Sequence, residues 1–206
     1  LVSAAISIQG ISKHYGEGSD AVLALDGIDL DIASGEFVSL LGPSGCGKST
    51  MAAALSESLD LDMVDGDDLH LPESVAKMRA GIALQDDDRW PWLDSIGRLL
   101  AQPAEDSSGG RVVACSALKR AYRERIRSMA APLQFVFLDG PAELIEHRMA
   151  MRTGHYMNPT LLDSQLRALE RPGADEPDIV RIDINRPVDQ LLAAALAALQ
   201  ADGATA

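Results

Sequence analysis

The chain has 206 residues, a hydrophobic content of 47% and a net charge of −13 at neutral pH. These values indicate a globular protein with one α/β domain and a short extension. The acidic balance argues against nucleic acid as a partner, because phosphate backbones are bound mainly by an excess of Lys and Arg. It leaves a nucleotide open, since a nucleotide needs only a few local cations and backbone amides. No run approaches the roughly 18 apolar residues of a membrane span, so we expect no membrane contact.

The two cysteines, Cys46 and Cys115, do not form a spacing typical of metal sites or disulfide frameworks. We therefore expect a protein of the reducing cytoplasm. Cys46 falls in a glycine-rich loop without a His partner in sight, so we interpret it as a small loop residue and not a catalytic thiol.

The first part of the chain alternates apolar and polar residues. Residues 5–12 and 22–33 show this period of two, which predicts half-buried strands. A turn signal follows at 34–36, and the continuous apolar run 37–41 is typical of a buried central strand. We expect two parts: a β extension at residues 1–35 and an α/β domain at residues 36–206.

From residue 42 onward the pattern changes to alternating helices and strands. A glycine-rich loop at 42–47 precedes helical spacing at 48–59. Further strands are predicted at 61–64, 111–115, 134–138 and 179–184. Further helices are predicted at 73–80, 88–101, 119–130, 141–152, 159–170 and 187–199. Strands alternating with helices favour parallel βαβ units.

The segment Gly42-Pro-Ser-Gly-Cys-Gly-Lys-Ser49 matches the phosphate-binding pattern G-x4-G-K-[ST]. Its glycines let consecutive N–H groups turn toward a phosphate, and the following helix aims its positive end at the same anion. Lys48 can reach the β and γ oxygens, and Ser49 can hold Mg²⁺. We predict ATP and Mg²⁺ as ligands in a P-loop three-layer sandwich with a central parallel sheet, like that of nucleoside-monophosphate and shikimate kinases. The expected nucleotide-binding residues are Gly42, Ser44, Gly45, Cys46, Gly47, Lys48, Ser49 and Thr50.

An acidic segment, Asp65-Gly-Asp-Asp-Leu-His70, follows the second core strand. Ligands of open α/β sheets bind outside the carboxyl ends of the strands, where a carboxylate can accept a proton from an acceptor hydroxyl. The alternative is a solvated acidic turn or a helix N-cap, where Asp is also favoured.

Several segments together resemble the gluconate kinase (gluconokinase) family over residues 36–200. They are Asp65–His70, Val75–Met78, Asp86–Leu93, Val113–Arg123, Gly154–Met157 and Leu161–Glu170. The resemblance implies transfer of the ATP γ-phosphoryl group to gluconate, giving 6-phosphogluconate. Two places depart from the family pattern after His70, at Leu71 and Ser74, and the lid carries Asn158 where the family usually has Pro.

The resemblance also implies roles for individual residues. Asp67 matches the candidate base, and Arg148 and Arg152 match arginines that lead into a lid begun by Gly154 and His155. The implied catalytic residues are Lys48, Asp67, Arg123 and Arg152, with Arg148 at the nucleotide. The implied substrate-binding residues are Asp67, His70, Lys77, Arg89, Lys119, Arg120, Arg123 and His155.

Some of these side chains have simpler interpretations. Arg125 and Arg127 are expected on a solvated helix face, and His155 is open to interpretation as a surface loop residue. Trp90 and Trp92 are expected as core anchors more than as stacking platforms.

Residues 1–50 are similar to the start of an ABC-transporter ATPase, and the two resemblances meet in the phosphate loop. The hypothesis is a chimera joined at that loop. Function as a transporter ATPase is disfavoured, because the nearest match to the required Leu-Ser-Gly-Gly-Gln signature, at 108–111, lacks Leu and Gln. A second alternative is a chimera that binds nucleotide without efficient turnover. An exposed edge of the extension also makes a homodimer possible, and we expect residues 1–33 to be least protected in hydrogen exchange.

Overall fold

The computed structural model describes residues 4–15, 22–33, 37–102, 110–130, 132–151 and 159–203. Its centre is a five-stranded sheet in the order β4-β5-β3-β6-β7, and every neighbouring pair is parallel. The strands are β3 (Phe37–Leu41), β4 (Asp62–Asp65), β5 (Arg111–Ala114), β6 (Leu133–Asp139) and β7 (Ile179–Asp183). The predicted parallel sheet is confirmed, with the strand before the phosphate loop at its centre.

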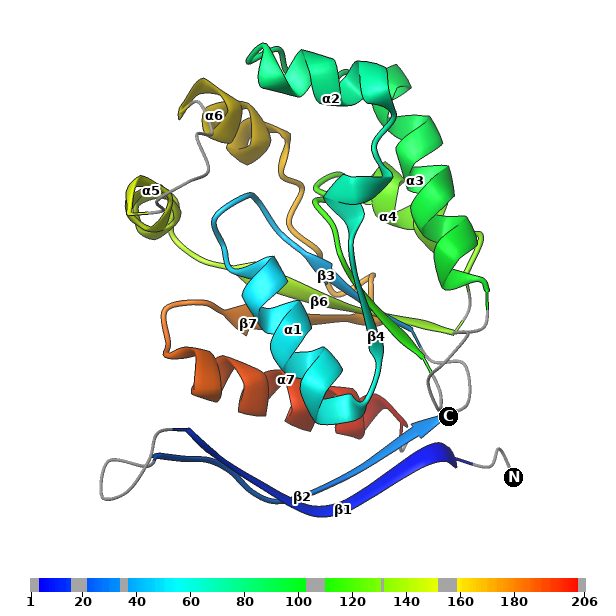
Figure 1. Ribbon diagram of the computed structural model, residues 1–206, viewed down its shortest axis with the longest axis vertical. Coiled ribbons are helices and arrows are strands. Elements are labelled where there is room, and N and C mark those ends of the chain that lie inside the picture. The colour runs from blue at the N-terminus through cyan, green and yellow to red at the C-terminus, as the bar shows by residue number, and fades with distance from the viewer. Residues whose placement is uncertain are drawn as a thin grey trace.

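Seven α-helices connect and cover the described strands (Figure 1). They are α1 (Lys48–Leu59), α2 (Pro72–Arg79), α3 (Asp86–Leu100), α4 (Arg120–Arg127), α5 (Ala142–Ala150), α6 (Pro159–Ala168) and α7 (Val188–Gly203). Each matches a predicted helix, although α4 ends three residues before the predicted bound and α7 ends four residues after it. One short 3₁₀ helix, η2 (Gly66–Leu69), was not predicted. No helix in the described ranges is both long enough and apolar enough to cross a membrane.

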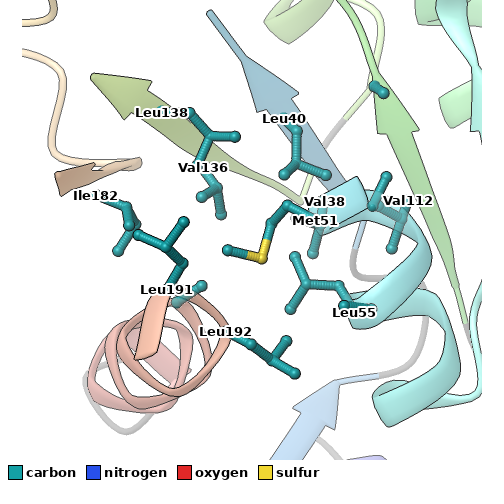
Figure 2. Packing of buried hydrophobic residues seen from close by; sticks show 14 of the residues in the cluster. Val38, Leu40, Met51, Leu55, Val112, Val136, Leu138, Ile182, Leu191 and Leu192 are labelled. Atoms are coloured by element: carbon teal, nitrogen blue, oxygen red, sulfur yellow. The ribbon is translucent and has the colours of Figure 1, made fainter. Parts of the chain in front are cut away.

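Helices α1 and α7 cover one face of the sheet. Met51 and Leu55 of α1, with Leu191 of α7, pack against strand residues such as Leu40 and Val136 (Figure 2). These side chains are almost fully buried. Their removal from water fixes the start of α1, and with it the phosphate loop, against the centre of the sheet.

Helices α3 and α4 cover the opposite face. Trp92 and Ile96 of α3 and Ile126 of α4 are fully buried against Phe135 and Phe137 of β6. Alternate residues of β6 thus enter different cores, as the side-chain period of a strand requires. The three-layer sandwich predicted from the sequence is confirmed.

The N-terminal strands form a separate two-stranded antiparallel sheet. Within the described residues, β1 (Ala4–Tyr15) and β2 (Val22–Ala33) pair with each other and not with the five-stranded sheet. β2 lies against α7, outside the sandwich (Figure 1). The two predicted strands are confirmed, and their separate sheet sets them apart from the layers that build the site.

Candidate active site

The phosphate loop leaves β3 through three glycines in the left-handed half of backbone space. Gly42, Gly45 and Gly47 have φ of 143°, 86° and 103°. A Cβ on Gly47 would meet nothing within 4 Å, so its conformation alone demands glycine. A Cβ on Gly45 would lie 2.4 Å from Met149 Cγ, so the loop is also packed closely against α5.

Lys48 and Ser49 begin α1 directly behind the loop. Lys48 Nζ donates hydrogen bonds to the carbonyl oxygens of Gly42 at 2.8 Å and Pro43 at 3.1 Å. Ser49 Oγ donates to Asp65 Oδ2 at 3.3 Å. The ammonium therefore lies over the loop, and the hydroxyl faces the carboxyl end of β4.

Asp65 is a site residue that the sequence-based prediction missed. Its other oxygen accepts a hydrogen bond from Asp67 N at 3.1 Å, which makes it the N-cap of η2. The N-cap interpretation thus holds for Asp65, while Asp67 is displayed on the turn that Asp65 caps. The available signal was the spacing of two carboxylates, two residues apart, where β4 ends.

The turn that carries Asp67 is fixed from below. A Cβ on Gly66 would lie 2.7 Å from the carbonyl oxygen of Ala114, so this turn packs directly on β5. Trp92 Nε1 donates a buried 2.6 Å hydrogen bond to Gly66 O. Trp92 is 0% exposed, which confirms it as a core anchor.

Asp67 lies in an unusual electrostatic setting for a carboxylate. Burial raises its pKa above the usual range, with Asp65 and Asp68 adding to the rise, while Lys48 and Arg89 act to lower it. Asp67 is nevertheless an exposed residue, so neighbouring atoms crowd its carboxylate without closing it off from solvent or a substrate. A raised pKa strengthens Asp67 as a proton acceptor.

His70 stacks on Trp92, with ring centroids 4.4 Å apart and planes 12° apart. Burial, assisted by the positive charge of Arg89, lowers the pKa of His70 to about 4. Its Nδ1 is buried and has no hydrogen-bond partner among the described residues. The imidazole is therefore neutral near pH 7, and its backbone N–H bonds to Asp67 O at 3.4 Å, which ties the ring to the turn that carries Asp67.

Three cations predicted for the acceptor gather around the start of α3. Lys77 pairs with Asp88 at 2.6 Å, and Lys119 pairs with Asp86 at 2.6 Å. In contrast, the guanidinium of Arg89 has no hydrogen bond or ion pair within the described part of the chain and lies 5.8 Å from the centre of the Tyr122 ring.

The Tyr122 ring also packs edge-on against Trp90, with centroids 5.5 Å apart. Its hydroxyl donates to Asp86 Oδ1 at 2.6 Å. Arg89 therefore stands over an aromatic ring that the core and α3 hold in place.

The implied catalytic and substrate-binding role of Arg123 requires correction. Its guanidinium is 1% exposed and binds both carboxylate oxygens of Glu176, at 2.5 and 2.9 Å. It also donates to the carbonyl oxygens of Leu118 and Glu170. Arg123 is thus a structural residue that ties α4 to the segment before β7, because its donors are occupied inside the protein.

The other arginines of α4 are also paired. Arg120, implied as a substrate contact, is exposed and binds Glu124 and Asp175. Arg125 pairs with Asp94 on the surface, as expected for a solvated face. Arg127 is partly exposed and pairs with Asp178, so it reaches solvent less than Arg125 does.

A pocket of about 300 Å³ opens on the other side of the loop. Arg148 lines it and is held by a 2.8 Å hydrogen bond from Nη2 to Ile184 O. Its remaining lining residues are Gly45, Cys46, Gly47, Thr50, Met51, Leu138 and Leu191. Burial raises the pKa of the Cys46 thiol, so it stays protonated and matches the non-catalytic interpretation. Arg152 and His155 lie outside the described residues.

The glycine loop, Lys48, Ser49 and Asp67 at the carboxyl edge of a parallel sheet define a P-loop kinase. The AAA domain family matches residues 37–172. The thermosensitive gluconokinase of Escherichia coli (strain K12) is 43% identical over 155 residues, covering 75% of this chain and 82% of that protein. The gluconokinase of Gluconobacter oxydans (strain 621H) is 39% identical over 166 residues, covering 81% and 92%. The chain belongs to the gluconokinase family, as its motifs predicted.

Solved structures agree with this assignment. A gluconokinase from Sinorhizobium meliloti 1021 superposes with a TM-score of 0.72 at 43% identity, over 80% of this chain and 91% of that one. A sugar kinase from Janibacter sp. HTCC2649 gives a TM-score of 0.74 at 40% identity, over 80% and 94%. The APS kinase of Mycobacterium tuberculosis, at 22% identity and a TM-score of 0.55, shares the fold.

Proposed function

We propose that this protein transfers the γ-phosphoryl group of ATP to gluconate, giving 6-phosphogluconate and ADP. One observation carries the proposal beyond family membership: Arg89, which has no ion pair among the described residues, is near enough to Asp67 for its charge to lower the pKa of that carboxyl. A base and a free cation are what a hydroxylated carboxylate requires of its site.

Asp67 accepts the proton of the attacking hydroxyl in this mechanism. Its raised pKa makes it a better acceptor than a fully solvated carboxylate. Lys48 lies over the phosphate loop, where its charge stabilises the negative charge on the transferring group. Most of the catalytic effect then comes from positioning and charge, as is general for phosphoryl transfer.

Mg²⁺ is the metal that these residues fit. Ser49 Oγ and Asp65 Oδ2 supply two oxygen donors 3.3 Å apart beside the loop. Mg²⁺ prefers oxygen ligands and usually keeps water and phosphate oxygens, so a site with few protein ligands suits it. When bound, the ion neutralises charge on the nucleotide phosphates.

Arg89 binds the carboxylate of gluconate, and the neutral His70 ring packs on Trp92 at the same end of the site. Lys77 and Lys119 are engaged with the acidic first turn of α3, which leaves Arg89 as the cation with a free guanidinium among these three. A planar guanidinium matches a carboxylate in two parallel hydrogen bonds.

We also propose that residues 1–35 form an extension outside the catalytic domain of residues 36–206. The separate β1–β2 sheet supports this division, and so does the family match that begins at residue 37. The origin of the extension in a transporter ATPase, with a junction in the phosphate loop, remains a hypothesis that rests on the resemblance of residues 1–50. β3 keeps continuous parallel register with β5 and β6, which favours turnover over a site displaced by the extension.

The test is a coupled assay with Mg-ATP and gluconate, in which NADP-dependent oxidation of 6-phosphogluconate reports product. We expect turnover in the wild type and a large loss in Asp67→Asn. Intact ATP binding without product would instead support a nucleotide-binding chimera that does not turn over. The same assay with a panel of uncharged polyols in place of gluconate would distinguish a protein without turnover from a kinase that acts on another substrate.

A further inference from the structure

Gln165 of α6 makes two hydrogen bonds to one residue of the phosphate loop, Ser44. Its Oε1 accepts a hydrogen bond from Ser44 N at 2.8 Å, and its Nε2 donates to Ser44 Oγ at 3.2 Å. The amide therefore fixes both the backbone and the side chain of Ser44. Within residues 42–47, Ser44 is the only position whose N–H is held by a side chain of the described structure.

The helix that carries Gln165 is itself anchored in the core. Leu162 is 3% exposed in the cluster beneath the loop, and Leu166 packs against the same cluster. Gln165 lies three residues after Leu162, one turn along the same side of the helix, and directly precedes Leu166 in sequence. Because α6 is anchored in the core, the position of the Gln165 amide against Ser44 is restricted.

Ser44 follows directly on the part of the loop that Lys48 covers, which is where the proposed function puts the γ-phosphate. Lys48 Nζ binds the carbonyl oxygens of Gly42 and Pro43, the two residues before Ser44, and the lysine of such loops meets the β and γ oxygens. The Arg148 pocket begins beyond Ser44, at Gly45. The N–H groups of Gly45 and Gly47 have no partner among the described residues, so they are open to an anion, whereas Ser44 N–H is occupied by Gln165.

From this arrangement we propose that Gln165 is a positioning residue for the γ-phosphate of the bound nucleoside triphosphate. It holds Ser44 so that the neighbouring loop amides and Lys48 meet that group in a fixed geometry. The inference rests on the proposed function only in that the loop binds ATP. It does not depend on which acceptor receives the phosphoryl group.

The experiment is calorimetric titration of Gln165→Met with Mg-AMP-PNP and with Mg-ADP. Methionine keeps the length of the side chain but makes neither hydrogen bond. We expect affinity for AMP-PNP to fall about tenfold, as for the loss of hydrogen bonds that order a charged site, with affinity for ADP within about twofold of wild type. Ser44→Ala removes only the Oγ contact and should give a smaller loss that is not additive with Gln165→Met.

Asp163→Asn is the matched control, because Asp163 is an exposed residue of the same helix. Its affinities for both nucleotides should equal those of the wild type. Gln165→Glu gives a second arm if the methionine variant fails to fold: it keeps the acceptor, loses the amide donor and adds a negative charge, so AMP-PNP should weaken more than ADP.

Equal weakening of both nucleotides, unchanged affinity for AMP-PNP, or tighter AMP-PNP binding would each overturn the proposal. Tighter binding would show that the amide competes with the phosphate for Ser44 N–H. The titration uses no acceptor. If the wild type failed to phosphorylate gluconate, the proposed substrate would be contradicted, but the nucleotide affinities of the Gln165 variants could still be interpreted.

Discussion

Trp92 Nε1 and Gly66 O form a 2.6 Å hydrogen bond between α3 and the turn that displays Asp67. The same indole stacks on His70. One buried side chain therefore fixes the base, the neutral imidazole and, through α3, the position of Arg89. The residues on the acceptor side of the site are therefore positioned by contacts with a buried core residue and not by independent surface loops.

We expect Trp92→Phe to lower both stability and turnover. Phenylalanine leaves the buried carbonyl oxygen of Gly66 without its donor, which costs about 1–3 kcal/mol of unfolding free energy. Urea denaturation measures this loss, and steady-state kinetics should show a reduced kcat. Trp90→Phe is the control, because Trp90 is half-buried and has no role at Gly66. Equal effects of the two substitutions would contradict the assigned role of Trp92.

Asp67→Asn should lower kcat by roughly 10²–10⁴-fold, the usual contribution of a positioned base, with nucleotide affinity retained. In the wild type, activity should rise as pH increases through the raised pKa of Asp67, because the ionised form is the acceptor. His70, with a pKa of about 4, should add no step near pH 6.5. A pH profile of kcat checks both statements.

Asp67→Asn should also raise the melting temperature at pH 7. A raised pKa means that the folded protein holds the Asp67 proton more tightly than the unfolded chain does. Stability from this group is therefore present at low pH and is lost as pH rises through the folded pKa. Asparagine does not ionise, so the gain should shrink toward pH 4. Differential scanning fluorimetry at the two pH values measures it, and a melting temperature lowered at pH 7 would contradict the sign.

Arg89→Gln should raise KM for gluconate by about 10–100-fold, as expected for the loss of a charge-assisted pair, without changing KM for ATP. The variant should also discriminate less between gluconate and an uncharged polyol. Lys77→Gln is the comparison, since Lys77 is already paired with Asp88. A larger increase in KM for gluconate at Lys77 than at Arg89 would show that Arg89 is not the cation that binds the carboxylate.

Glu176→Gln should destabilise the protein by about 3–5 kcal/mol, because it leaves the buried guanidinium of Arg123 without its counter-charge. Hydrogen bonds from Arg123 hold the pKa of Glu176 below its usual value. This pair therefore stabilises the fold above the unfolded pKa of a glutamate, and the contribution disappears as pH falls through the lower, folded value.

Denaturation of Glu176→Gln and of the wild type, each followed from pH 7 to pH 3, measures this contribution. The difference between them should narrow on acidification. Arg125→Gln removes an exposed, solvent-screened pair with Asp94 and should cost far less stability than Glu176→Gln. If Arg125→Gln and Glu176→Gln lowered the free energy of unfolding equally, burial would not be what makes the Arg123–Glu176 pair stabilising.

Local sequence patterns predicted most of the fold. The strand at 22–33 and the helix at 48–59 have the predicted bounds, because each is defined by a run of regular period and a clear turn or loop. The phosphate loop was equally predictable, since its chemistry is contained in eight consecutive residues.

The residues that sequence reasoning misplaced have distant partners. Arg123 meets Glu176 across 53 positions, and Gln165 meets Ser44 across 121. An arginine-rich helix has the same local pattern whether its side chains meet substrate, solvent or a buried carboxylate. Only the tertiary pairing distinguishes these cases, so Arg123 was assigned to the substrate and Gln165 was left without a role.

The central position of β3 has a consequence for the order in which the protein can be built. The phosphate loop is synthesised early, but the strands on either side of β3, β5 and β6, follow much later in the chain. Non-local pairings of this kind form slowly, because a long segment must close before the contact gains anything. A ribosome-bound chain that ends before β6 therefore carries the complete loop sequence without the sheet that shapes it. ATP can support folding only after that strand has emerged, so nucleotide binding stabilises a chain whose central strands have already paired.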